Sequence, residues 1–150
     1  MTHPVSQSQV LARRGELLAE LLLQELGAEF IARPAADLGY DFFVGFGNPE
    51  GGVNLAAVEV KATERPVRSP FAVDRRLFRR LANSNIPVVL LVADVKENRL
   101  YYAIPTAHGG NGHAGGNTVS LPLTAVDDTT RSELRDQLAN APANGSLAAH

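Results

Sequence analysis

The sequence contains no cysteine, no long apolar run and no glycine-rich phosphate-binding loop of the Walker type. Without cysteine the chain has no disulfides, no thiolate metal ligands and no cysteine nucleophile. No apolar stretch approaches the roughly 20 residues that a membrane-spanning helix needs. The first residues, Met1 to Pro4, lack a basic segment followed by an apolar one. We therefore expect no secretory signal, no membrane association and a cytoplasmic location.

The composition is that of an ordinary globular protein, with 45% hydrophobic and 20% charged residues in a chain of 150. A chain of this length can bury a sizeable hydrophobic core. We predict a single domain over residues 1–139, with its core at about 9–105, and a disordered tail over 140–150. The formal net charge of -2 argues against a generally basic nucleic-acid-binding protein.

The stretch from Asp41 to Lys61 predicts a β-hairpin. Two segments rich in β-branched, aromatic and other apolar residues flank a joint of Gly, Asn and Pro residues at 47–52. The alternation of a strand places Glu59 and Lys61 on one face of the second segment, and Val60 on the other. An antiparallel hairpin would bring Asp41 beside Glu59. Two carboxylates and an amine would then converge at one end of a sheet.

This group of side chains suits metal-dependent phosphoryl chemistry. Two close carboxylates repel each other unless a cation lies between them, and magnesium prefers oxygen ligands. A bound magnesium ion polarises a phosphoryl oxygen and lowers the pKa of its bound water. Lys61 would orient that water or stabilise developing charge. The alternative interpretation is that Glu59 and Lys61 are ordinary charges on a solvated sheet face.

The remaining periodicity predicts an α/β fold with a mixed sheet. Apolar spacing and terminating residues favour helices over 9–26, 73–83 and 129–138. Further strands are expected over 28–33, 88–93 and 99–104, with a small edge strand over 118–123. The run at 88–93 is apolar without alternation, as in a central strand buried on both faces. The helix over 73–83 would be the crossover between this strand and the hairpin, and the glycine- and histidine-rich segment 108–117 is expected to be a mobile loop.

Glu16 is a further candidate acid, on the first expected helix. When that helix is projected at 100° per residue, Glu16 lies at the edge of the apolar arc, whereas Glu20 points to water. A carboxylate at the boundary of the core can lean towards a site. The alternative is that Glu16 forms a local ion pair.

Half of the 14 Lys and Arg residues lie between positions 61 and 80. Four arginines of the expected helix over 73–83 form two neighbouring rows at i,i+4 spacing, and two more lie in the preceding loop. We expect this basic patch to contact the phosphates of a nucleic acid. Its arginines are Arg65, Arg68, Arg75, Arg76, Arg79 and Arg80. The alternative for each arginine is a solvated helix face.

These residues resemble a known family. Arg14-Gly15-Glu16 on a first helix, Asp41 opening a strand and Glu59-Val60-Lys61 ending the next are similar to the motif of the PD-(D/E)xK nuclease superfamily. More narrowly, the chain resembles restriction-endonuclease-like domains of unknown function and Holliday-junction resolvases, which keep a first-helix glutamate. The resemblance covers roughly residues 13–104 and implies a restriction-endonuclease-like core. Tyr40 stands where the name of the superfamily has proline.

The resemblance implies a magnesium-dependent nuclease, with manganese as a substitute, that hydrolyses DNA in restriction, repair or phage defence. Asp41, Glu59 and the main-chain carbonyl of Val60 would bind the metal. Lys61 would serve the attacking water, and Glu16 would assist the metal or a second one. The alternative is a catalytically inactive module on the same fold that binds nucleic acid or protein. The small size favours a homodimer or a partner protein.

Overall fold

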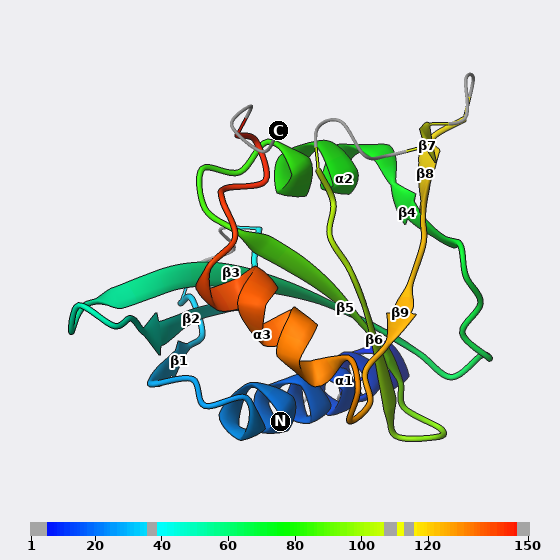
Figure 1. Ribbon diagram of the computed structural model, residues 1–150. Helices are drawn as coiled ribbons and strands as arrows, with labels where there is room; N and C mark the ends of the chain where they lie inside the picture. Colours follow the sequence, from blue (N-terminus) through cyan, green and yellow to red (C-terminus); the bar gives the residue numbers. More distant parts are fainter. Residues whose placement is uncertain (1–5, 36–38, 107–110, 113–115, 147–150) are drawn as a thin grey trace.

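The computed structural model describes residues 6–35, 39–106, 111–112 and 116–146, and its main feature is a mixed six-stranded sheet (Figure 1). The strand order is β1-β2-β3-β5-β6-β9. The strands are β1 (Phe30–Ala32), β2 (Phe42–Gly47), β3 (Val53–Thr63), β5 (Val88–Asp94), β6 (Arg99–Ala103) and β9 (Thr124–Ala125). β3 and β5 pair in parallel, and the other neighbours pair antiparallel. The predicted α/β class and the central antiparallel hairpin are confirmed.

Three helices and a second, three-stranded sheet make up the other elements of the described residues. They are α1 (Gln7–Glu25), α2 (Arg75–Ala82), α3 (Arg131–Ala139), β4 (Phe71–Asp74), β7 (Asn111–Gly112) and β8 (Thr118–Leu121). Helices α1 and α3 cover one face of the large sheet, and α2 with the small sheet covers the other (Figure 1). Across the described residues, every helix is too short or too polar to cross a lipid bilayer.

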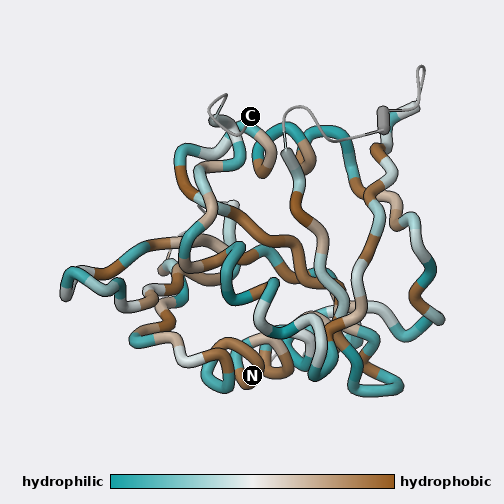
Figure 2. The backbone as a smooth tube through the Cα atoms, viewed as in Figure 1, coloured by the Kyte–Doolittle hydropathy of each residue, from teal (hydrophilic) through white to brown (hydrophobic). Residues whose placement is uncertain are grey.

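The alternation of β3 divides the core into two halves. Ala56, Val58 and Val60 pack in the cluster under α1 and α3, while Ala57 packs in the cluster under α2. All seven residues of β5 are buried, as its unbroken apolar run predicts. Figure 2 shows this strand as a hydrophobic stretch through the middle of the molecule. Glu59 and Lys61 therefore belong to the face that α2 covers.

A close approach fixes α1 on the opposite face. A Cβ atom at Gly15 would lie 2.7 Å from the Cβ of Ala62 and 3.4 Å from that of Ala93, so the helix backbone lies almost directly on β3 and β5. The helix begins at a capping box formed by Ser6 and Gln9. It ends before Gly27, whose φ of +90° belongs to the left-handed region, and the predicted helix end is confirmed.

The crossover differs from the prediction in its first turn. Val73 belongs to β4 and not to the helix, because Asp74 caps the N-terminus of α2. The Asp74 carboxylate accepts hydrogen bonds from the backbone N–H groups of Arg76 and Leu77, at 2.8 and 3.3 Å. Val73 is nevertheless buried, with its backbone extended.

The strand predicted over 118–123 is present as β8, but its predicted place at the edge of a sheet is wrong. β8 lies in the middle of the small sheet, between β4 and β7, and pairs Phe71 with Leu121 across 50 residues of sequence. Part of the expected loop 108–117 is strand β7, paired with β8. Residues 108–110 and 113–115 of that expected loop lie outside the described residues.

The predicted disorder of 140–150 is wrong for residues 140–146. Asn144 is buried, and its side chain hydrogen-bonds the N–H and the C=O of Val88 and the C=O of Pro105, at 2.8, 2.9 and 2.6 Å. Two of these bonds satisfy backbone groups of Val88, at the start of β5, and the third satisfies the carbonyl of Pro105, after β6. Residues 147–150 lie outside the described part of the chain.

The contacts of Asn144 predict that Asn144→Ala destabilises the protein by about 2–4 kcal/mol, since each buried backbone group left unsatisfied costs roughly 1–3 kcal/mol. Urea unfolding followed by circular dichroism measures the change. Asn85→Ala, at an exposed position, is the matched control and should change the free energy of unfolding by less than about 0.5 kcal/mol. Equal stability of the two variants would contradict a structural role for residues 140–146.

Candidate active site

The open end of the β2–β3 hairpin holds Asp41 against β3. The register pairs Phe42 with Val58, and the Asp41 N–H donates to the Val58 carbonyl at 3.0 Å. The Asp41 carboxylate in turn accepts a hydrogen bond from the Val60 N–H at 2.7 Å. Asp41 is therefore fixed at both its backbone and its side chain, beside the segment of β3 that carries Glu59. This is the convergence that the hairpin predicts.

Glu59 is buried, with 7% of its surface exposed. Burial, a hydrogen bond with Asp41 and the negative charge of Asp41 together raise its pKa to about 8, while the charges of Lys61 and Arg80 act in the opposite direction. Burial disfavours an ionised carboxyl, and a second carboxylate at hydrogen-bonding distance disfavours it further. Without a bound cation, Glu59 therefore holds a proton at neutral pH and can donate a hydrogen bond to Asp41.

Two cationic side chains lie next to these acids. Lys61 is exposed and shares a strand face with Glu59. Arg80 reaches over from α2, and its Nη2 lies 3.7 Å from Oε2 of Glu59. Because the Arg80 side chain is 51% exposed, this contact is weak and the guanidinium is accessible to a ligand. Asp41, Glu59, Lys61 and Arg80 are called the acid site below.

Gly39 shapes the acid site through Arg80. Its φ of +88° is a left-handed conformation that side chains disfavour. A Cβ atom at this position would lie 2.6 Å from Nε of Arg80. Glycine therefore provides both the turn that delivers Asp41 to the sheet and the space into which Arg80 extends.

The donor atoms of the acid site are compatible with a hard divalent cation. Asp41 and Glu59 place carboxylate oxygens side by side, and the N–H and C=O of one strand residue face the same neighbour, so the Val60 carbonyl lies on the edge next to Asp41. Among the described residues, no group of three or more acidic or histidine side chains could hold a metal. A cation here would complete its shell with water or substrate oxygens, as magnesium commonly does.

Glu16 lies apart from the acid site. Its helix packs on the face of β3 opposite to Glu59, through Gly15 and Ala62. The Glu16 carboxylate accepts a hydrogen bond from the Arg33 guanidinium at 2.6 Å. This is the local ion pair named as the alternative for this residue. An assisting role for Glu16 stays a prediction.

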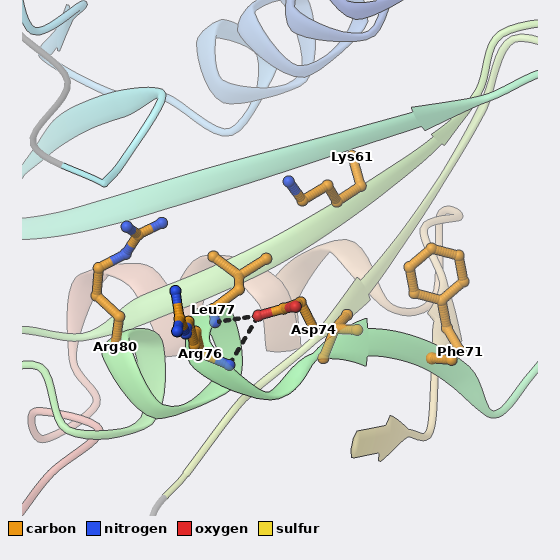
Figure 3. Close-up of a pocket in the computed structure, with 8 residues that line it drawn as sticks. Lys61, Phe71, Asp74, Arg76, Leu77 and Arg80 are labelled. Carbon is orange, nitrogen blue, oxygen red and sulfur yellow. Dashed lines mark hydrogen bonds between the residues drawn. The ribbon is translucent and has the colours of Figure 1, made fainter. Parts of the chain in front are cut away.

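The predicted basic patch divides between two directions. Arg76 and Arg80 line a cavity of about 380 Å³ that Lys61 also lines (Figure 3). Arg75 turns to the other side of α2, where its Nε donates to the Gly116 carbonyl at 3.1 Å. The other predicted phosphate contacts, Arg65, Arg68 and Arg79, are exposed. One of the two arginine rows thus lies next to the acid site.

The cavity itself is not apparent from the sequence. Its wall is formed largely by β4, in a segment whose sequence predicts a loop followed by a helix. The available signal is short: the apolar run Phe71-Ala72-Val73 before Asp74, a residue type that favours helix N-caps. Even this signal does not show that β4 pairs with β8, and this pairing fixes Phe71 at the cavity.

Comparison of the chain with protein family models, with curated proteins and with solved structures gives no significant match. The functional interpretation therefore depends on the acid site, on the cavity beside it and on the motif resemblance of Asp41, Glu59, Val60 and Lys61.

The raised pKa of Glu59 predicts that stability depends on pH when no cation is bound. Between the ordinary pKa of 4.5 and the folded-state value of about 8, the folded protein holds a proton that the unfolded chain has released. The free energy of unfolding should therefore decrease as pH rises from about 4.5 to about 8. Urea unfolding at pH 5 to 8 with a chelator measures this slope, which should be much smaller in Glu59→Gln.

Glu50→Gln is the matched control, because Glu50 is exposed in the turn at the other end of the same hairpin. This variant should keep the wild-type slope. If wild type and Glu59→Gln lose stability equally over this pH range, Glu59 is ionised in the folded protein and the description of the acid pair is wrong.

Proposed function

We propose that this chain is a magnesium-dependent nuclease that hydrolyses phosphodiester bonds of DNA on a restriction-endonuclease-like core. The observation that carries the proposal is the convergence of Asp41, Glu59 and Lys61 at the open end of the β2–β3 hairpin. These residues follow the PD-(D/E)xK motif, with Tyr40 in place of its proline. Manganese is expected to replace magnesium.

Each residue of the acid site has a role in this proposal. Asp41, Glu59 and the Val60 carbonyl would hold the cation, which when bound supplies a Lewis acid and a water of lowered pKa. Lys61 would orient the attacking water from the same strand face as Glu59. Arg80 would donate to non-bridging oxygens of the phosphate, where negative charge accumulates in the transition state.

The state of the acid site without a cation supports this assignment. A buried acid that keeps a proton beside a second carboxylate lacks sufficient positive charge around it, even with Lys61 and Arg80 nearby. A purely structural site would be more stable with one of the two acids replaced by a neutral residue. Perturbed acids beside accessible cationic side chains are typical of functional sites.

A binding module without catalytic activity is the second candidate. It is favoured by the same protonated Glu59, because the proton and the contact with Arg80 stabilise the acids without any metal. In such a module the basic residues would bind phosphates while the acids stay neutralised. Cleavage assays distinguish the two candidates directly.

The cleavage assay uses plasmid, linear, branched and single-stranded nucleic acids with magnesium, manganese or a chelator. Asp41→Asn and Glu59→Gln should each lower the cleavage rate by a factor of roughly 100 or more, the usual effect of losing a positioned catalytic group. Glu50→Gln should cleave at the wild-type rate. Wild-type cleavage by both acid-site variants, or no cleavage by the wild type on any substrate, would refute the nuclease proposal.

Metal binding should release a proton, because Glu59 must ionise to become a ligand. Below the Glu59 pKa of about 8, the apparent affinity for magnesium should therefore rise about tenfold per pH unit. Calorimetric titrations at pH 6, 7 and 8, in buffers of different ionisation enthalpy, measure both quantities.

Lys61→Met should keep metal binding and lose cleavage, since the amine is not a ligand. Loss of magnesium binding in this variant would contradict the role assigned to Lys61.

A further inference from the structure

The cavity beside the acid site has the size of a small-molecule pocket. Its volume is about 380 Å³, at the lower end of the range for ligand pockets of roughly 300–1,000 Å³. Residues of β3, β4 and α2 line it: Lys61, Phe71, Ala72, Val73, Asp74, Arg76, Leu77 and Arg80. A pocket of this size accommodates one nucleotide.

The two ends of the cavity differ in chemistry. Figure 3 shows Phe71 at one end and Arg80 at the other, with Asp74 between them. The Phe71 end is apolar and the Arg80 end is basic, with Arg76 close by. Asp74 is the one acid of the lining, and its carboxylate already accepts two backbone hydrogen bonds from α2. The cavity therefore suits a ligand with a planar apolar part and an anionic part.

Phe71 is held rigidly enough to act as a stacking surface. It pairs with Leu121 in the small sheet, and part of its ring packs against the core under α2 while the rest lines the cavity. Stacking of a nucleobase on such an aromatic ring accepts any base, because every base has a π-face.

The acid site and the cavity share Lys61 and Arg80. Arg80 contacts Glu59 and also lines the cavity. Lys61 shares a strand face with Glu59 and lines the cavity as well. A phosphate bound by these two side chains would thus lie beside Asp41 and Glu59. The base of the same nucleotide would extend along the cavity towards Phe71.

From this arrangement we infer that the cavity binds one unpaired nucleotide of the substrate, with its base against Phe71 and its phosphate at Lys61 and Arg80. This inference rests on the proposed nuclease function and specifies its substrate class. A base inside a duplex cannot enter, because its partner strand would have to enter with it. The substrates are therefore single-stranded, flapped or branched nucleic acids, and intact duplex is a poor one.

Binding in the presence of a chelator tests the inference apart from catalysis. The probes are a fluorescent short oligothymidylate, an abasic oligomer with the same number of phosphates, and a blunt duplex. Wild type should bind the oligothymidylate most tightly of the three. Phe71→Ala should weaken oligothymidylate binding by about 5- to 150-fold, the usual loss for one stacked base, and should bind the abasic oligomer as the wild type does.

A second variant protects the test against misfolding of Phe71→Ala. Ala72 is exposed and lines the cavity, so Ala72→Leu narrows it without a change in the core. This variant should also lose the preference for oligothymidylate over the abasic oligomer. Ala12→Leu, at an exposed position on α1, and Phe30→Ala, on β1, are the matched controls and should keep the wild-type preference.

Two results would overturn the inference: wild-type protein that binds the abasic oligomer as tightly as oligothymidylate, or cavity variants that keep the full base preference. Failure of the nuclease proposal looks different. Protein that shows the base preference, and loses it in Phe71→Ala and Ala72→Leu, but cleaves nothing with any cation would keep the nucleotide pocket and refute the hydrolysis.

Discussion

The pairing of Asp41 with the end of β3 is the constraint on which the candidate site depends. The hydrogen bond from the Val60 N–H to the Asp41 carboxylate replaces a backbone partner just before β2 begins, so the hairpin itself positions one acid beside another. Burying Glu59 next to Asp41 is costly, and the raised pKa of Glu59 reflects that cost. The proton, Lys61 and Arg80 each offset part of it. A bound divalent cation would offset it more completely.

The crossover between the parallel strands β3 and β5 builds the rest of the site. Parallel neighbours need a long connection, and here the connection contains β4 and α2, which both lie over the face that carries Glu59 and Lys61. Asp74 ends β4 and starts α2, and it thereby sets Arg76 and Arg80 facing the sheet. The same connection thus supplies Arg80 to the acid site and Phe71 to the wall of the cavity.

Patterns among neighbouring residues predict the parts of this structure that depend on residues close together in the sequence. Strand alternation places Glu59 and Lys61 correctly, and the unalternating run at 88–93 correctly indicates a central strand. The missed features depend on partners that are distant in sequence. The residues near Phe71 in the sequence do not indicate its pairing with Leu121. The residues near Asn144 do not indicate that its side chain hydrogen-bonds the backbone of Val88. The ion pair of Glu16 with Arg33 likewise depends on where β1 ends relative to α1.

In the proposed nuclease, the charges of the acid site would couple the binding of the cation to the binding of the substrate. With Glu59 protonated, Asp41, Lys61 and Arg80 leave an excess of one positive charge. A divalent cation that displaces the proton of Glu59 raises this excess to two. A phosphodiester would therefore bind more tightly once the cation is present, and by thermodynamic linkage the substrate would strengthen cation binding by the same factor. Ionised Glu59 also competes with the phosphate for Arg80, and the exposure of that side chain makes the exchange inexpensive. In the proposed nuclease, hydrolysis would thus require both the cation and an unpaired nucleotide, and would be restricted to strands that can place a base in the cavity.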